Sequence, residues 1–548
     1  MKKPYRESMP FCPGSCKPPL TENDRRSVHH RDKNRVFIRN PETEDASCRS
    51  SFSLFDAPVN VEVKLDLPIS GAKLIHFKLK IIFILTIEVM ATIAIVADLP
   101  DMNSDQNKSS TDKDSRLIGN ASRKELLAWA LYDFANSGYT TVVQTTIFSA
   151  YFVGVVAGTA QGVAPGLSTL LWSLAIGIAN FVVMISGPLL GAIADHRACK
   201  KLFLLISSVG CIVSTASLAM VGPGDIGLGM VLVTLSAIMF AGGENLIAAF
   251  LPEIVLKENM GKMSGYGWSL GYFGGLLTLA ICLAYITWAK QHGLPETHFV
   301  PVTLLITAAI FALTATPTFL WLQERAIPAT LDRGRSNLQI SYARLAHTFK
   351  EAARFRDLLW FLITLGVYQS GVSTVVVLAA VYAQEVMGFD TQSLIMLIMV
   401  VNVTAAVGAF ICGHLQDRIG SIPTLAITLL VWIVAVTVAL LADKPALMWV
   451  AGNIIGLAMG ASQSVGRALV SKFSPAERAG EFLGLWGLVN RLSAIVGPLS
   501  YGLINYWSNG NHRMSLLSTL SFFIVGLILL LKVNESRGKA AAIIDNAG

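Results

Sequence analysis

The sequence predicts an all-α membrane protein whose twelve transmembrane helices form two pseudo-symmetric halves of six. Three observations lead to this fold class. Of the 548 residues, 53% are hydrophobic and only 14% are charged, against about 25% charged in soluble proteins. Apolar stretches recur along most of the chain, and each is long enough to cross the hydrocarbon core of a bilayer as a helix. Related short motifs then recur in the two halves of this hydrophobic region.

Residues 1–122 form an N-terminal extension that we expect to be mostly polar and disordered. Within it, the hydrophobic segment 77–99 contains Glu88 and lies too far from the first residue to be a signal peptide. Two interpretations remain open: an extra membrane helix, or translated upstream sequence that the working protein lacks. We favour a start at Met90 or Met102, because a lone extra helix would disturb the arrangement of twelve.

Cysteines and histidines in this extension suggest a metal site at first sight: Cys12, Cys16, Cys48, His29 and His30. Their spacing matches no standard zinc pattern. We therefore expect unstructured thiols, and neither a metal nor another cofactor.

Twelve hydrophobic spans follow the extension. We expect them at 129–158, 168–194, 202–221, 226–250, 265–287, 299–321, 358–383, 391–415, 423–441, 446–470, 481–506 and 513–532. The polar, basic loop 322–357 then separates an N-terminal half, 123–321, from a C-terminal half, 358–535, and residues 536–548 form a short tail.

The distribution of basic residues predicts the orientation in the membrane. Loops on the side of the 322–357 linker carry fifteen basic residues, whereas the opposite loops carry only Lys290, Lys444 and Arg513. Because positively charged loops remain in the cytoplasm, we expect a cytoplasmic linker and both ends of the twelve-helix core in the cytoplasm. The positive charge is spread over loops and forms no contiguous basic surface, which argues against nucleic-acid binding.

A short motif recurs after the second and eighth spans, as "GAIADHRACKK" and "GHLQDRIGSIP". Asp195 and Asp417 are 222 residues apart, about the length of one half, and this repetition is typical of duplicated transporters. We expect the glycines to let helices approach closely and the aspartates to accept hydrogen bonds at the N-terminus of a neighbouring helix. The arginines would hold those carboxylates or meet headgroup phosphates. The alternative is a tight turn with a solvated acid and anchoring bases. The candidate gating-loop residues are Gly191, Asp195, Arg197, Gly413, Asp417 and Arg418.

The paired loops resemble the signature of the major facilitator superfamily. The stretches "WALYDFANSGYTTVV", "SGYGWSLGYFGG" and "SQSVGRALVSKFSPAERAGEFLGLWGLVNRLSAIVGP" are similar to the subfamily of fungal autophagy-related vacuolar amino-acid effluxers and their bacterial relatives. The resemblance covers about residues 123–535. It implies alternating access about a central cavity lined by the first, fourth, seventh and tenth helices, a location in a bacterial plasma membrane, and a monomer. Departures from the family pattern are His196, Ala198, Cys199, Ser421, Ile422, Asn490, Arg491 and Glu244.

Polar residues gather on the spans that this resemblance places around the cavity. Polar side chains in hydrocarbon are costly unless they are paired or wet, so we expect them to point inward. For a single amide, a hydrogen bond between helices is an equally simple explanation. The candidate cavity residues are Asp133, Asn136, Thr140, Gln144, Glu244, Asn245, Gln369, Asn453, Gln463 and Arg467, of which the first four share one face of a predicted helix.

Three charged residues suggest a mechanism. We hypothesise that Glu244 and Arg467 form an ion pair toward the cytoplasmic side that breaks as the cavity opens, the alternative being a local partner for Glu244. Arg467 could instead bind a substrate carboxylate. Asp133 or Glu244 could carry a coupling proton, since burial favours a neutral carboxyl group.

The sequence therefore predicts a secondary transporter of a small polar solute and not an enzyme. Amino-acid efflux is what the resemblance implies. A proton-coupled importer of a sugar or peptidoglycan fragment is the alternative, and a receptor or scaffold on a transporter fold is the alternative from another class. No P-loop is present in the sequence, which argues against ATP-driven pumping.

Overall fold

A computed structural model describes residues 121–158, 162–255, 260–325, 350, 352, 354–474 and 479–547. The N-terminal extension up to residue 120, with the hydrophobic segment 77–99 and the cysteines and histidines of that region, lies outside the described residues. So does most of the predicted linker. The predicted domain division therefore stays a prediction.

Twelve of the described helical spans are long and apolar enough to cross a membrane. They agree with the twelve predicted spans to within six residues at either end, which confirms the all-α transmembrane fold class. The N-terminal spans are Arg123–Ala157 (α3, η1, α4 and η2), Leu167–Arg197 (α5), Lys200–Leu218 (α6), Ile226–Ala248 (α7, followed by α8, Leu251–Ile254), Met260–Gln291 (α9) and Glu296–Trp321 (α10). The C-terminal spans are Arg356–Met387 (α12), Thr391–Ile419 (α13), Ser421–Leu441 (α14), Pro445–Phe473 (α15), Ala479–Trp507 (α16) and His512–Leu530 (α17), followed by α18, Glu535–Ala547.

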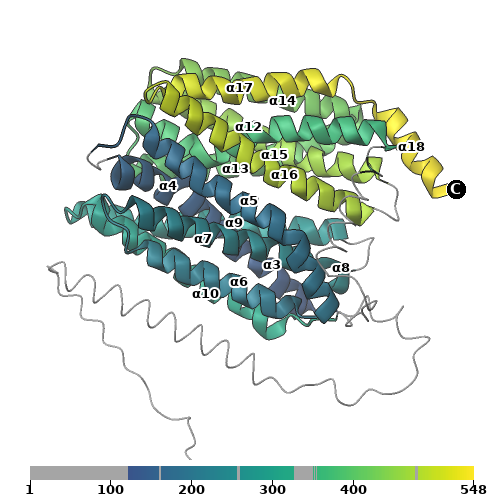
Figure 1. Ribbon diagram of the computed structural model, residues 1–548, viewed down its shortest axis with the longest axis horizontal. Coiled ribbons are helices and arrows are strands. Elements are labelled where there is room, and N and C mark those ends of the chain that lie inside the picture. The colour runs from purple at the N-terminus through teal and green to yellow at the C-terminus, as the bar shows by residue number, and fades with distance from the viewer. Residues whose placement is uncertain are drawn as a thin grey trace, which may run out of the picture. The chain divides into compact units, whose positions relative to one another are not determined.

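The helices run side by side, so the bundle has two ends (Figure 1). We call them the α18 end, which also carries α8, and the α4 end. Helices of the N-terminal half lie together, and those of the C-terminal half lie together beside them. Helix α18 occupies residues where the sequence predicts only a tail. Its first turn is bonded to α14 through Glu535 and to α12 through Arg537.

The first span is not a uniform α-helix. Helix α3 (Arg123–Tyr139) passes into a π-helical segment, η1 (Thr140–Thr146), then α4 (Ile147–Tyr151) and a second π-helical segment, η2 (Phe152–Ala157). Such segments are rare and occur frequently at functional sites. The predicted polar face assumed α-helical spacing throughout, and the structure has that spacing only up to Tyr139.

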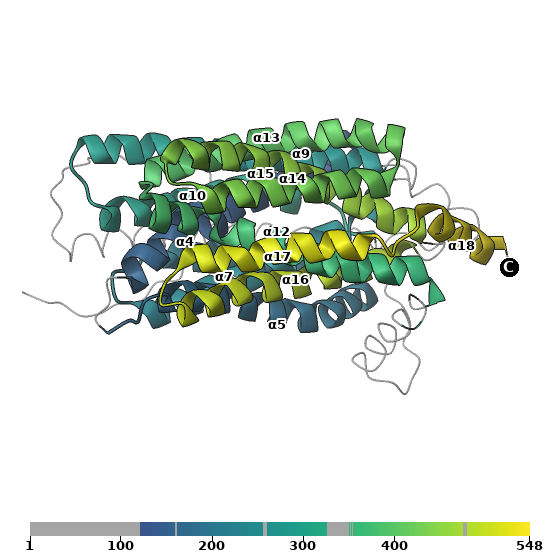
Figure 2. The same ribbon diagram turned by 90° about the horizontal axis from the view of Figure 1, so that it is seen from above.

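Helices α5 and α16 form an antiparallel seam between the two halves, and both views show them side by side (Figures 1 and 2). At one end of the seam Gly166, at φ +78°, lies against Asn505, and a Cβ on Gly166 would come 2.5 Å from the carbonyl oxygen of Asn505. Further along, Gly502 lies against Ser173. Small residues thus let the two helices approach closely. Helices in a membrane associate mainly through such packing, because lipid provides no hydrophobic driving force between them.

The halves are also joined at the α4 end by polar contacts from α13 to α9 and α10. Lys290 pairs with Asp390, Thr391 donates to Glu296 at 2.8 Å, and Gln392 donates to Thr287 at 2.7 Å. Burial alone would raise the pKa of Asp390, but hydrogen bonds from Lys290 and Ser393 outweigh it and lower the pKa to about 2. The stabilisation from this carboxylate is therefore present above the usual pKa of Asp and is lost only as the pH falls toward 2.

The C-terminal half is held together by a close approach of α13 and α15. Gly452, Gly456 and Gly460 recur at four-residue spacing on α15, a pattern that brings membrane helices together. A Cβ on Gly460 would overlap the carbonyl oxygen of Ala405 on α13.

We expect Gly460→Val to lower the stability of the C-terminal half, because the added carbons have no room, and overpacking costs about 1–3 kcal/mol. Gly413→Ala is the matched control, since a Cβ on Gly413 meets no described atom within 4 Å. Thermal unfolding of the purified protein in detergent measures both changes. Equal midpoints for the two variants would contradict the close packing of α13 on α15.

Candidate functional site

Arg491 on α16 is the centre of a polar cluster between the two halves. Its Nη2 donates to Glu244 Oε2 at 2.7 Å and to Asn245 Oδ1 at 3.4 Å, both on α7, and its Nη1 donates to Asn180 Oδ1 on α5 at 3.4 Å. The side chain of Glu244 is 46% exposed and that of Arg491 is 21% exposed. A guanidinium from the C-terminal half is therefore bound by three oxygen atoms from the N-terminal half.

The seam between α5 and α16 sets the depth of this cluster. Arg491 lies near the middle of α16, twelve residues after Ala479, and faces the central part of α5. Gly177 and Ile495 make the next contact along the same seam. Glu244 and Asn245, in contrast, lie within four residues of Ala248, the last residue of α7, so the cluster reaches from the middle of the seam toward the end of α7.

Arg467 on α15 lies between two tryptophan rings, with its Cζ 5.8 Å from the ring centroid of Trp268 and 5.2 Å from that of Trp486. It also interacts electrostatically with Glu244 and with Asp133. From the sequence we hypothesised a direct Glu244–Arg467 pair. In the structure Arg491 takes the direct contact with Glu244, because α16 packs against α5 and α5 in turn packs against α7.

Asp133 and Asn136 lie on α3, on the first span. The carboxylate of Asp133 faces α9, where a Cβ on Gly267 would overlap its Oδ2, and it forms no hydrogen bond or ion pair with the described residues. Asn136 is only 6% exposed, yet neither atom of its amide has a hydrogen-bond partner among the described residues. Thr140 bonds to the backbone oxygen of Asn136 at 3.0 Å.

The other candidate cavity residues are less distinctive. Gln144 lies in η1 near the hydroxyl of Tyr139. Asn453 donates to the backbone oxygen of Trp449 one turn earlier, at 2.8 Å, which fits a structural role within its own helix. Gln369 is buried on α12 and Gln463 is partly buried on α15. The described residues contain no cluster of three or more His, Cys, Asp or Glu that could hold a metal ion.

The gating-loop prediction needs correction. A Cβ on Gly191 or Gly413 would meet no described atom within 4 Å, so neither glycine is required for a close approach. Asp417 is exposed and bonds to no described residue, although we expected it to cap a neighbouring helix. Arg197 and Arg418 are exposed at the ends of α5 and α13. The side chain of Asp195 lies outside the described part of the structure.

Glutamates after the last helix of each half perform the capping that was predicted for those aspartates. Glu324 accepts from the backbone N–H groups of Lys200 and Lys201, at 2.6 and 3.1 Å, where α6 begins. Glu535 accepts from Ser421 and Ile422, at 2.8 and 3.2 Å, where α14 begins. A carboxylate at a helix N-terminus satisfies unpaired N–H groups and is favoured by the helix dipole.

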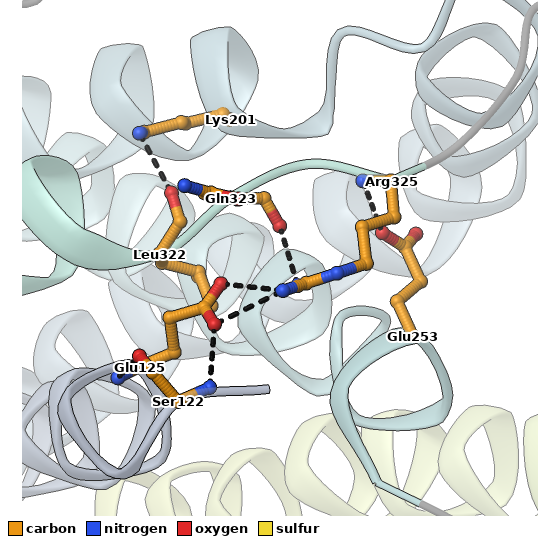
Figure 3. Close-up of polar contacts among 7 residues, drawn as sticks. All are labelled: Ser122, Glu125, Lys201, Glu253, Leu322, Gln323 and Arg325. Atoms are coloured by element: carbon orange, nitrogen blue, oxygen red, sulfur yellow. Dashed lines mark hydrogen bonds and ion pairs between the residues drawn. The ribbon is translucent and has the colours of Figure 1, made fainter. Parts of the chain in front are cut away.

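An ion pair accompanies each of these caps. In the N-terminal half, Arg325 Nη2 donates to both carboxylate oxygens of Glu125 at 2.8 and 3.0 Å (Figure 3), and Glu125 also closes a capping box with Ser122. In the C-terminal half, Arg537 donates twice to Asp357, each time at 2.7 Å. We call these two arrangements the N-clamp (Glu125, Glu324 and Arg325) and the C-clamp (Asp357, Glu535 and Arg537). Each joins the first helix of a half to the segment that follows its last helix.

The N-clamp extends to α8 through Glu253. Its carboxylate accepts from Lys200 Nζ at 2.6 Å. It also accepts from the backbone N–H of Arg325 at 3.1 Å (Figure 3). Lys201 donates to the carbonyl oxygen of Leu322 at 2.7 Å. Four separate segments of the N-terminal half therefore meet at the α18 end.

The sequence of residues 168–543 matches the family described as vacuole effluxer Atg22 like. The chain belongs to this family, which lies within the major facilitator superfamily. It is 28% identical over 414 residues to an uncharacterised transporter of the same superfamily, YxiO of Bacillus subtilis, covering 75% of this chain and 95% of that protein. It is 25% identical over 348 residues to autophagy-related protein 22 of Yarrowia lipolytica, covering 56% of this chain and 57% of the fungal protein.

Solved transporter structures have the same fold as this Atg22-like chain. The D-xylose–proton symporter has a TM-score of 0.58 at 16% identity, covering 76% of this chain and 99% of that structure. A mutant of the nucleoside transporter NupG has a TM-score of 0.57 at 14% identity, covering 75% of this chain and 99% of that structure. The prediction of a multi-pass secondary transporter of a small molecule is thereby confirmed.

We expect Glu324→Ala and Glu535→Ala each to destabilise the protein by about 1–3 kcal/mol, because each leaves backbone N–H groups without their partner. Asp417→Asn is the control and should change stability by less than about 0.5 kcal/mol, since its side chain is exposed. Denaturation midpoints of the three variants provide the measurement. A larger effect at Asp417 than at Glu535 would show that the gating-loop prediction was right.

The C-clamp should also weaken in acid. Burial alone would raise the pKa of Glu535, but bonds from Lys539, Ile422 and Ser421 outweigh it and hold the pKa below its usual range. Its stabilisation is therefore complete above the usual pKa of about 4.3 and is lost as the pH falls through the lowered value. The stability difference between the wild type and Glu535→Gln should shrink on acidification below about pH 4; a difference that grows would contradict the capping role.

Proposed function

We propose that this Atg22-like transporter exports amino acids from a bacterial cytoplasm across the plasma membrane. The cluster of Arg491, Glu244, Asn180 and Asn245 is the observation that carries this proposal, since it places charged and amide groups inside the bundle at the seam between two halves. Such groups are costly in a membrane unless they line a polar path. The family description as an effluxer supports the direction, and the match to nearly the full length of a bacterial relative supports the bacterial setting.

The distribution of charge supports an orientation with the α18 end in the cytoplasm. Lys200, Lys201, Arg325, Arg418 and Lys472 lie at or near helix ends on this side. The opposite end carries Lys290, Lys444 and Arg513, of which Lys290 and Arg513 pair with acidic residues. A positive cytoplasmic side is the general rule for membrane proteins.

We further propose that Asp133 carries a coupling proton. Its carboxylate lies in the interior of the first span, bonds to no described residue and interacts with both Glu244 and Arg467. Gain or loss of a proton at Asp133 would therefore change the balance of charge around the cluster. Asp133, Glu244 and Arg467 belong to one chain, so a monomer contains every group that the proposed proton coupling requires.

Transport by the purified protein in proteoliposomes tests the function directly. Metabolite profiles of cells that lack or overproduce the protein would first identify accumulated solutes, and radiolabelled flux of those solutes would follow. We expect amino acids to accumulate inside cells that lack the protein. Flux of a sugar or a peptidoglycan fragment, with none of any amino acid, would replace the proposal with the importer alternative.

Asp133→Asn should abolish transport driven by a pH gradient and should retain exchange of labelled for unlabelled solute, because exchange requires no net movement of protons. Asp443→Asn is the control, since Asp443 lies at the surface of the α4 end. Uptake and exchange are measured in the same proteoliposomes. Unchanged pH-driven transport in Asp133→Asn would refute the coupling role.

An impermeant maleimide applied to whole cells tests the orientation. In a variant with Cys12, Cys16, Cys48, Cys199 and Cys412 replaced by serine, which leaves the buried Cys211 and Cys282, we expect a cysteine in place of Lys444 to be labelled from outside. A cysteine in place of Arg418 should be labelled only after the membrane is permeabilised. The reverse labelling pattern would overturn the proposed orientation.

A further inference from the structure

The charges of the central cluster are segregated between the two halves. The acidic residues Asp133 and Glu244 belong to the N-terminal half, and the guanidinium groups of Arg467 and Arg491 belong to the C-terminal half. The four charges sum to zero. Any movement that separates the halves therefore separates acids from bases, which is unfavourable in the interior of a membrane protein unless something else pairs with each side.

The contact of Glu244 with Arg491 is geometrically incomplete. Only one carboxylate oxygen of Glu244 bonds to Arg491, and the Nε of Arg491 donates to none of the described residues. A guanidinium binds a carboxylate most strongly when two parallel hydrogen bonds form. Arg491 therefore has the capacity to bind a free carboxylate more completely than it binds Glu244.

Glu244 is also placed so that it can leave. Its side chain is nearly half exposed, whereas Arg491 also donates from Nη1 to the amide oxygen of Asn180 and from Nη2 to that of Asn245. Loss of Glu244 would leave the guanidinium in place, with one position open for an anionic group. The released carboxylate of Glu244 would at the same time need a cationic partner.

We propose that a small zwitterionic solute inserts into the Glu244–Arg491 ion pair. Its carboxylate binds Arg491, with Asn180 and Asn245 orienting the guanidinium, and its ammonium group binds Glu244. This inference rests on the proposed function and assigns its substrate contacts to particular residues. The site selects by charge, because an anion leaves Glu244 without a partner, a cation leaves Arg491 without one, and a neutral solute leaves both.

Arg467 has a different environment and a different part in this arrangement. Its guanidinium lies over the faces of Trp268 and Trp486, an interaction that holds a cation against aromatic rings. It also offsets the charge of Asp133. The solute therefore meets Arg491 as its carboxylate partner, and Arg467 keeps the rest of the cluster neutral.

The experiment compares charge variants of one solute. Each of the twenty common amino acids is first tested singly for thermal stabilisation of the full-length protein in detergent and for flux in proteoliposomes. The best of those with an uncharged side chain is then compared with its N-acetyl derivative, which is an anion, and with its amide, which is a cation. In the wild type we expect half-maximal stabilisation by the amino acid at a concentration at least about tenfold lower than by either derivative, equivalent to about 1.4 kcal/mol.

Variants then assign each contact. Glu244→Gln should make the amino acid and its N-acetyl derivative equivalent, because the ammonium group has lost its partner. Arg491→Gln should make the amino acid and its amide equivalent. The double variant with Glu244→Arg and Arg491→Glu retains a pair of opposite charges, so it should recover a preference for the zwitterion. Asp443→Asn, at the surface, should retain the wild-type preference.

The outcomes separate this inference from the proposed function. Amino-acid flux by the wild type with equal binding of all three charge forms would overturn ion-pair insertion and leave the proposed function intact. Ion-pair insertion is also overturned, and the proposed function left intact, if Glu244→Gln and Arg491→Gln fold, as judged by size exclusion, and keep the full preference for the zwitterion. If no amino acid binds or is transported, the proposed function and the inference are both overturned.

Discussion

A guanidinium in the interior of a membrane-spanning helix must have partners, and the arrangement of the central helices follows from this requirement. Arg491 finds its three oxygen partners on α5 and α7. Those helices can supply them only because α16 lies directly against α5, and that approach depends on small residues such as Gly166 and Gly502. The contacts of Arg491 and the small residues of the α5–α16 seam therefore depend on each other. Larger side chains in the seam would move α16 away from α5 and leave the guanidinium without its oxygen partners.

The two halves are similar in architecture, and the clamps show that the similarity extends to individual hydrogen bonds. In both halves an acid after the last helix caps the third helix of that half, and an adjacent arginine pairs with an acid near the start of the first helix. The surrounding sequences, "LQER" and "VNESR", share little beyond that acid and that base. The two halves thus share the capping of a helix terminus by an acidic side chain, although the sequences around the two acids are little alike.

The twelve helices could be predicted from sequence because apolar length is a strong and local signal. The site was only partly predictable. Glu244, Asn245 and Arg467 were identified as polar residues on helices expected to line the cavity, whereas Arg491 was noticed only as a departure from the family pattern. Its role depends on which helices are neighbours across the seam, and no periodicity within one chain segment reports that. The capping expected of Asp417 was wrong for a similar reason, since Glu535, far along the chain, binds the N–H groups where α14 begins. Glu324 and Glu535 are 211 residues apart, which differs from the 222-residue offset between Asp195 and Asp417, so the repeat did not point to them.

The clamps have a consequence for how the protein can be divided. The N-clamp joins α3 and α6 to the residues directly after α10, and the C-clamp joins α12 and α14 to α18, so all residues of the N-clamp precede residue 326 and all residues of the C-clamp follow residue 356. Each half is thus held together by its own clamp. A gene split between Arg325 and Asp357 would encode two polypeptides that each retain a complete clamp, and their reassembly would rely on the α5–α16 seam and the contacts at the α4 end. The covalent link between the halves would then serve to provide one copy of each half.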